Sequence, residues 1–134
     1  MHELLKTVYK VLEREEFIKP LLETCAKQTE AERVGFWSIK EEIIFCEWLY
    51  VKEKGDFEKG YHFKKDKCKE FLNALEEENI FESKMVQEDE RLGECMKDYF
   101  MSHNMTLLLA IPIWFEGRLF GFLSLEKSQK RQWL

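Results

Sequence analysis

The stretch that decides the fold is TLLLAIPIWFEGRLFGFLSLEKSQKRQWL, residues 106–134. It is the longest apolar run in the chain, and Glu116 and Gly117 divide it into two pieces of strand length. A glycine at that point supplies the positive φ that a tight turn needs, so we predict a β-hairpin. Both sides of each pleat are apolar, whereas a strand with one solvated face alternates with polar residues. The hairpin is therefore predicted to lie in the middle of a sheet covered on both faces.

The size and composition of the chain indicate one globular domain. Its 134 residues are enough for a single core and too few for two ordinary domains. Apolar residues make up 45% and charged residues 35%, which excludes a disordered chain. The net charge of -5 disfavours nucleic acid or an anionic membrane as a partner. No apolar run is long enough for a membrane span and no signal peptide is recognisable, so we predict a cytoplasmic protein.

The four cysteines are Cys25, Cys46, Cys68 and Cys95. They show no CxxC spacing and lie inside apolar patterns. This arrangement favours reduced, buried thiols over a disulfide framework or a zinc site, and we predict no metal site.

Two helical patterns open the chain. In the first, residues 1–16, apolar side chains recur at three- and four-residue spacings. These residues are Leu4, Leu5, Val8, Val11 and Leu12. They are candidates for the seam of a helical dimer, and the alternative is that they pack on their own domain. Pro20 is predicted to begin or kink a second helix, because proline is tolerated only in a first helical turn.

The middle of the chain alternates between strand and helix patterns. We predict strands over 33–39 and 43–51, a loop over 52–65 with a short strand at 61–63, a helix over 66–79, a short strand over 80–86 and a helix over 88–101. This order predicts an α+β domain with a central antiparallel sheet of five or six strands. Terminal helices cover one face of that sheet, and the two middle helices cover the other.

Three stretches resemble the GAF domain family of signalling sensors. Residues 31–37, AERVGFW, are similar to the family's entry into its first strand. Residues 98–106, DYFMSHNMT, are similar to its approach to the central hairpin. Residues 111–133 are the most specific, with Ile-Pro-Ile, two spaced glycines, Glu126 and a final Arg-x-Trp.

The resemblance covers nearly the whole chain and implies a single GAF-like sensory domain over residues 1–134. Residues 127–134 would then start a helix that leads to an output domain, such as a diguanylate cyclase or a histidine kinase. Because the chain stops one residue after Trp133, the analogy implies a sensory module separated from its effector. It further implies a non-catalytic homodimer of two-component or cyclic-di-GMP signalling.

In this family the two middle helices roof a ligand cavity, whose occupancy is coupled to the flanking helices. The residues predicted to line it are Trp48, Cys68, Phe71, Leu72, Leu75, Cys95, Met96 and Tyr99. Tyr99 or Trp48 would offer a polar atom to an unidentified small molecule. The NKxnFxxxDE pattern of cyclic-nucleotide relatives and the Asp-Ile-Pro motif of bilin-binding relatives are absent, and no cofactor is identified.

Two alternatives stay open. Facing apolar side chains can fill the cavity completely, which would leave a structural dimerisation module. The cysteines can also act as reactive thiols, as in the free methionine sulfoxide reductases of this fold, but they fall in helix and strand patterns rather than in loops. No catalytic motif is recognisable among the three histidines and the scattered acids, so we predict no enzyme.

Overall fold

The computed structural model describes residues 3–4, 6–7, 10 and 14–128. Its elements in chain order are α2 (Glu15–Thr29), β1 (Arg33–Lys40), β2 (Ile43–Val51), β3 (Asp56–Glu58), β4 (His62–Lys64), the 3-10 helix η1 (Lys65–Cys68), α3 (Lys69–Glu77), β5 (Phe81–Ser83), α4 (Lys97–Ser102), β6 (Met105–Phe115) and β7 (Arg118–Ser128). Every strand pairing is antiparallel. The strand order is β3-β2-β1-β7-β6-β5, and β4 also pairs with β2.

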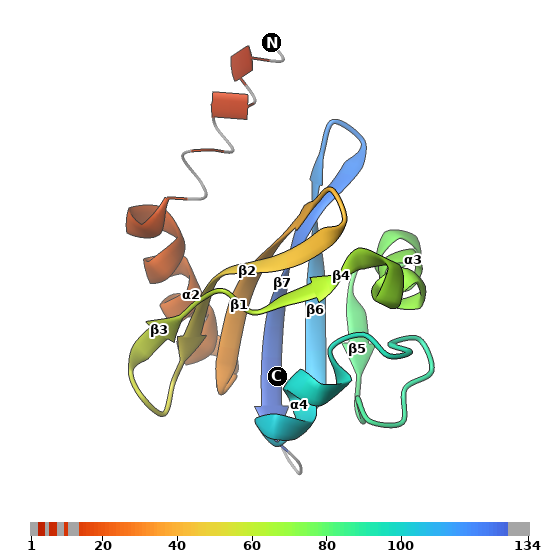
Figure 1. Cartoon of the computed structure of the whole chain (residues 1–134). Coiled ribbons are helices and arrows are strands. Elements are labelled where there is room, and N and C mark those ends of the chain that lie inside the picture. The colour runs from red at the N-terminus through yellow and green to blue at the C-terminus, as the bar shows by residue number, and fades with distance from the viewer. Residues whose placement is uncertain (1–2, 5, 8–9, 11–13, 129–134) are drawn as a thin grey trace.

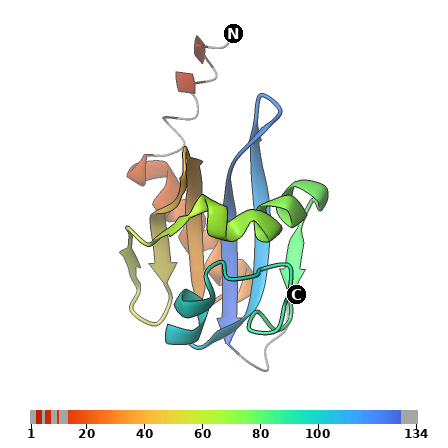
Figure 2. The same cartoon turned by 45° about the vertical axis from the view of Figure 1, so that its right-hand side comes forward.

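The molecule has three layers (Figures 1 and 2). Helix α2 lies on one face of the sheet, and α3 and α4 lie on the opposite face. This arrangement confirms the predicted α+β fold. No helix in the described part of the chain is long and apolar enough to cross a membrane.

The predicted central hairpin is β6 and β7, joined by Glu116 and Gly117, which both have positive φ values, 50° and 76°. Strand β7 lies between β1 and β6, and is therefore inside the sheet as expected. The prediction for the end of the chain needs a correction. Lys127 and Ser128 continue β7 and do not start a helix. Residues 129–134 lie outside the described residues.

The helix predictions need three further corrections. Helix α2 begins at Glu15 and runs through Pro20, so Pro20 does not start a helix. The predicted helix over 88–101 is wrong in its first half, because Gly93 and Met96 have left-handed φ values of 56° and 59° and α4 begins only at Lys97. The helix predicted over 66–79 is a 3-10 turn followed by α3.

The proposed dimer seam lies almost wholly outside the described residues. Of its five members only Leu4 is described, and its side chain is exposed. Leu5, Val8, Val11 and Leu12 are not among the described residues. The seam therefore stays a prediction.

Two apolar clusters fill the space on either side of the sheet. The inner cluster, between the sheet and α3 and α4, contains the largest fully buried rings, from Trp37, Phe71, Phe81, Phe100 and Phe122. The outer cluster, beneath α2, contains Ile18, Leu22, Ala26, Val34, Phe36 and Leu125. Burial on both faces explains why the strands of the central hairpin carry so few polar residues.

Candidate functional site

The space in which we predicted a ligand cavity is occupied by side chains. Cys68, Phe71, Leu72, Leu75, Cys95, Met96 and Tyr99 all belong to the inner cluster, and the most accessible of them, Leu72, is only 8% exposed. The Phe71 ring packs edge-on against Phe81 and Phe122, with centroids 5.2 Å apart in both pairs. Such contacts leave no room for a ligand unless side chains move.

The placement of Trp48 in this cavity is wrong. Trp48 lies on the outer face of the sheet, where it pairs with Phe36 and packs edge-on against Phe57. Strict alternation from Cys46 would have put Trp48 on the inner face. The register of β1 and β2 shifts at this point, so that Glu47 has no partner on β1 and every later residue of β2 changes face.

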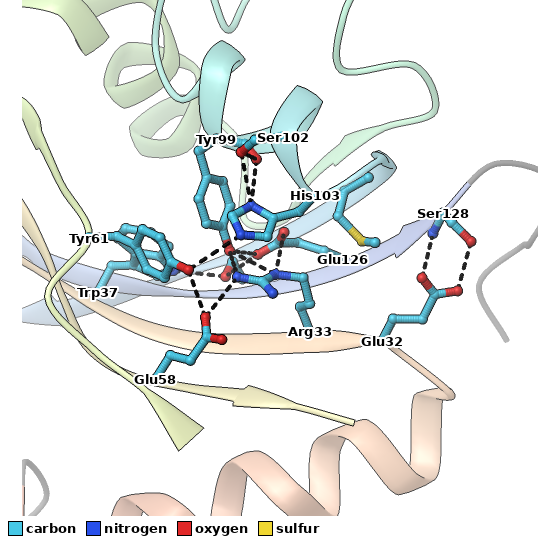
Figure 3. Close-up of polar contacts among 12 residues, drawn as sticks. Glu32, Arg33, Trp37, Glu58, Tyr61, Tyr99, Ser102, His103, Glu126 and Ser128 are labelled. Atoms are coloured by element: carbon cyan, nitrogen blue, oxygen red, sulfur yellow. Dashed lines mark hydrogen bonds and ion pairs between the residues drawn. The ribbon is translucent and has the colours of Figure 1, made fainter. Parts of the chain in front are cut away.

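A buried polar network lies at one end of the inner cluster (Figure 3). Arg33 and Glu126 are direct neighbours across β1 and β7, and their charged atoms are 3.7 Å apart. The Tyr99 hydroxyl, from α4, accepts hydrogen bonds from Nε and Nη2 of Arg33, both at 3.3 Å. It donates one to Oε2 of Glu126 at 2.8 Å. One hydroxyl group therefore joins α4 to both strands.

The network continues inward along the sheet. The Trp37 indole donates to the Ser124 hydroxyl at 2.8 Å, and Ser124 in turn lies 3.4 Å from Glu126. Gly35 makes this possible, because a Cβ there would lie 2.6 Å from the Trp37 indole nitrogen. Trp37 also stacks on Phe122, which fixes the ring.

The network continues outward to the surface through Glu58. Arg33 lies 3.5 Å from Glu58, which accepts a hydrogen bond from the Tyr61 hydroxyl at 2.7 Å. Tyr61 lies 3.3 Å from Nε2 of His103, and Nδ1 of His103 donates to the Tyr99 carbonyl at 2.8 Å. Burial favours the neutral form of Glu58, but hydrogen bonds from Lys54 and Tyr61 and the charge of Arg33 outweigh it and lower its pKa to about 2.

Glu126 has a different electrostatic environment. It is fully buried, and burial raises its pKa from the ordinary 4.5 to about 7, although Arg33 and the hydroxyl of Tyr99 favour the charged form. Its Oε1 atom has no hydrogen-bond partner among the described residues. Burial also raises the pKa of Tyr99 well above its usual value, so this hydroxyl keeps its proton. Glu126 is thus a member of this chain of contacts whose charge changes near neutral pH.

An open hollow of about 670 Å³ lies at the same end of the sheet. It is lined by Glu30, Glu32, Arg33, Val51, Lys52, Glu53, Lys54, Glu58, Ser102, His103, Asn104 and Met105. A larger hollow of about 1040 Å³ lies near the opposite end, between α3 and the β1–β2 and β6–β7 turns, and Leu72 borders it. Of these two hollows, the one of about 670 Å³ touches the buried network, through Arg33, Glu58 and His103. Within the described residues, no cluster of three His, Cys, Asp or Glu side chains is suited to a metal ion.

The same end of the sheet holds the places where the chain enters β1 and leaves β7. The Glu32 carboxylate accepts hydrogen bonds from the backbone N–H and the hydroxyl of Ser128, at 3.2 and 2.8 Å. Figure 3 shows this contact beside the Arg33 network. The buried network therefore lies beside the start of β1 and the end of β7.

Two of the four cysteines are not reduced, which corrects the sequence prediction. Cys68 and Cys95 form a disulfide with their Cα atoms 4.6 Å apart. Cys46 is a buried free thiol, as predicted, and Cys25 is a half-buried one. The pairing could not be predicted from sequence because Cys95 lies in a run of turns between β5 and α4, and not on the continuous helix that its apolar spacing indicated.

The arrangement of layers is shared with solved structures. No family model and no curated protein sequence matches this chain. A far-red cyanobacteriochrome photoreceptor is similar over 99% of this chain and 82% of its own, with a TM-score of 0.72 and 18% identity. The GAF domain of a two-component sensor histidine kinase from Bacillus halodurans is similar over 90% and 81%, with a TM-score of 0.66 and 19% identity.

This chain has a GAF-like fold. The fold is also found in a type II free methionine-R-sulfoxide reductase from Thermoplasma acidophilum, which covers 90% of this chain and 78% of its own, with a TM-score of 0.61 and 12% identity. At such identities the similarity concerns the fold alone, so the function of this GAF-like domain has to be argued from its own site.

The sequence contained a signal for this site that we did not interpret. Arg33 and Glu126 each stand next to apolar residues of a strand pattern, and both belong to the stretches that resemble GAF domains. A charge inside such a pattern is buried only when it is paired. Because the two opposite charges lie in strands of the same sheet, they could have been predicted to pair with each other. The contribution of Tyr99 could not, because it depends on where α4 crosses the sheet.

Proposed function

We propose that this chain is a non-catalytic regulatory domain of the sensor type, which passes a change near α4 to the segments that flank the domain. The network of Arg33, Tyr99 and Glu126 carries this proposal. Tyr99 belongs to α4, Arg33 begins β1 shortly after α2, and Glu126 is near the end of β7. A displacement of α4 breaks contacts at the start of β1 and near the end of β7 at the same time, which gives a physical route for a signal. The similarity to a photoreceptor and a histidine-kinase GAF domain supports a signalling role.

The proposed stimulus is a small polar molecule bound in the hollow at the end of the sheet. This site replaces the apolar cavity that we first expected beneath α3. Its lining mixes positive groups, such as Lys52, with carboxylates, such as Glu58, and so suits a ligand that carries both charge and hydrogen-bonding groups. A ligand transmits a signal only when it binds one arrangement of α4 better than another. We place the domain in a homodimer, next to an output domain of two-component or cyclic-di-GMP signalling.

The test is a thermal-shift and calorimetric screen of small metabolites and nucleotides against the whole chain. A compound that binds in the hollow should lose affinity in Lys52→Glu, which reverses an exposed charge of the lining. Lys69→Glu, an exposed lysine of α3 outside the hollow, is the matched control. Binding that survives Lys52→Glu unchanged would place the ligand elsewhere. A screen without any binder would favour the next candidate.

That second candidate is a structural dimerisation module, and the filled inner cluster favours it. No space beneath α3 has to be kept open in such a protein. Sedimentation equilibrium of the whole chain should then give a dimer, weakened by Leu4→Arg at an exposed position of the predicted seam. A monomer at all concentrations contradicts this function.

A third candidate is enzymatic reduction of free methionine sulfoxide, and the Cys68–Cys95 disulfide favours it. The sequence pattern places the cysteines in helices and strands, which disfavours this reaction, but Cys95 lies among turns. The similar Thermoplasma acidophilum protein is named for this reaction. Incubation with methionine sulfoxide and excess dithiothreitol should yield methionine in the wild type and none in Cys95→Ser. An absence of methionine in both excludes this activity.

A further inference from the structure

The Cys68–Cys95 disulfide joins the end of η1 to the segment directly before α4. Cys68 is the last residue of η1, directly before α3, and Cys95 lies two residues before Lys97, at which α4 begins. Both sulfur-bearing side chains are buried, at 0% and 1% exposure. The bond therefore fixes the position at which the chain enters α4.

The segment between β5 and α4, residues 84–96, is held by different contacts along its length. Its first half is held by β6: the Val86 N–H donates to the Thr106 carbonyl at 2.9 Å, and the Gln87 amide donates to the Met105 carbonyl at 2.9 Å. Arg91 anchors the middle through the Glu82 carbonyl at 2.7 Å. The last residues before α4 are held by burial in the inner cluster and by the hydrogen bond from the Cys95 N–H to the Leu92 carbonyl at 2.9 Å. The disulfide adds a covalent link from Cys95 to Cys68, directly before α3.

Met96, next to the disulfide, has a backbone conformation that needs support. Its φ is 59°, in the left-handed region that residues with a side chain rarely adopt. The carbonyl of Met96 accepts the N–H of Phe100 at 3.0 Å, so this residue is also the first acceptor of α4. A change at Met96 reorients α4, and α4 carries Tyr99.

We propose that the Cys68–Cys95 disulfide is a redox-controlled latch, which when closed holds α4 where Tyr99 bridges Arg33 and Glu126, and when opened by a thiol reductant releases that bridge. The proposal rests on the proposed regulatory function and names a second stimulus for it, the thiol redox state. Its two-state element is the turn at Met96, whose left-handed form the closed latch favours.

The chemistry of opening is an ordinary exchange with a dithiol. One thiolate of the reductant attacks a sulfur of the disulfide, forming a mixed disulfide and expelling the other cysteine as a thiolate. The second thiol of the reductant then closes on the mixed disulfide and expels the remaining cysteine. The protein gains two electrons and two protons, and the reductant leaves as its own disulfide. Because both sulfurs are buried, local opening of residues 84–96 must precede attack.

The other two cysteines do not compete for this exchange. Cys46 is fully buried, and burial raises its pKa far above the ordinary thiol value, so it stays protonated. Burial also raises the pKa of Cys25 on α2. Among the described residues, Cys68 and Cys95 are the pair whose sulfur atoms are bonded to each other.

The test compares the whole chain after treatment with oxidised glutathione and after treatment with dithiothreitol. Intact mass and alkylation report the state of the bond, hydrogen exchange reports residues 84–103, and the indole N–H resonance of Trp37, assigned with Trp37→Phe, reports the buried network. Reduction should speed exchange in residues 84–103 by at least about tenfold and shift the Trp37 resonance. The double variant Cys25→Ser with Cys46→Ser should respond like the wild type, whereas Cys68→Ser with Cys95→Ser should be insensitive to the reductant.

Two outcomes overturn the latch. One is that Cys68 and Cys95 stay alkylatable under oxidised glutathione, so that no bond forms. The other is that the bond opens without any change in exchange or in the Trp37 resonance. Reduced wild type decides the question even if the cysteine variants fail to fold. A latch that fails while a metabolite still binds in the hollow leaves the proposed function intact, and a working latch without any bound metabolite removes only the small-molecule stimulus.

Discussion

The charge state of Glu126 gives the sharpest test of the buried network. Its pKa is 4.5 when solvated and about 7 in the folded protein, because burial disfavours the carboxylate. The folded state therefore binds the proton more tightly than the unfolded state. Stability is expected to fall as pH rises between these two values, and the full penalty is present above the folded pKa.

The size of this effect follows from the two pKa values. Between about pH 5 and about pH 8 the carboxyl group should remove about 2 to 3 kcal/mol of folding free energy. Glu126→Gln removes the titration while it keeps the shape of the side chain. The variant is therefore expected to gain about 2 to 3 kcal/mol relative to the wild type over that pH range. Its stability at a single pH is not diagnostic, because the amide also alters the hydrogen bond with Tyr99.

Urea unfolding of oxidised wild type and Glu126→Gln at four pH values provides the measurement. Glu23→Gln, an exposed carboxyl on α2, controls for the general cost of losing a carboxylate. Other titrating groups are common to all three proteins and cancel in the differences. Parallel stability profiles for wild type and Glu126→Gln would refute the reasoning, since they would mean that folding does not change the proton affinity of Glu126.

Three further comparisons test the contacts that hold the domain together. Tyr99→Phe removes a hydroxyl that makes three hydrogen bonds to charged groups, so it should cost about 2 kcal/mol in urea unfolding. Replacing both Cys68 and Cys95 by serine removes a cross-link over 27 residues, and the unfolding free energy should fall by about 3.5 kcal/mol under oxidising conditions and not under reducing ones. Gly121→Ala places a Cβ against the β1 backbone and should cost about 3 kcal/mol of stability. Gly117 lies in an open turn, so Gly117→Asn should be tolerated. Equal losses of stability in thermal unfolding of the two variants would contradict this difference.

The fold could be predicted from sequence because its deciding signals are local. The apolar run over 106–134 and the glycine at position 117 specify a buried hairpin without any information about the rest of the chain. The spacing of Phe71, Leu72 and Leu75 likewise specifies the apolar side of α3, all of which is buried. These patterns predicted a sheet with helices on both faces, and the structure has this arrangement.

The site could be predicted only in part, because its geometry depends on tertiary contacts. The β-bulge at Glu47 decides on which face of the sheet Trp48 lies, and no local sequence pattern predicts this bulge. The pairing of Cys68 with Cys95 depends on how residues 84–96 fold back on α3. The left-handed conformation of Met96 interrupts the helix that the apolar spacing predicts there. Each error arose where tertiary structure overrides a local preference.

The buried pair of Arg33 and Glu126 is difficult to explain by stability. A pair of charges taken out of water is seldom better than apolar side chains of similar volume, and here Oε1 of Glu126 lacks a hydrogen bond within the described residues. The surrounding rings of Trp37 and Phe122 show that this region of the sheet accommodates apolar packing. What the pair adds is sensitivity: its energy depends on one hydroxyl, that of Tyr99, and on one proton near neutral pH. A difference of about 1.4 kcal/mol changes a conformational equilibrium tenfold, so loss of the hydroxyl or a change in the protonation of Glu126 is large enough to shift such an equilibrium.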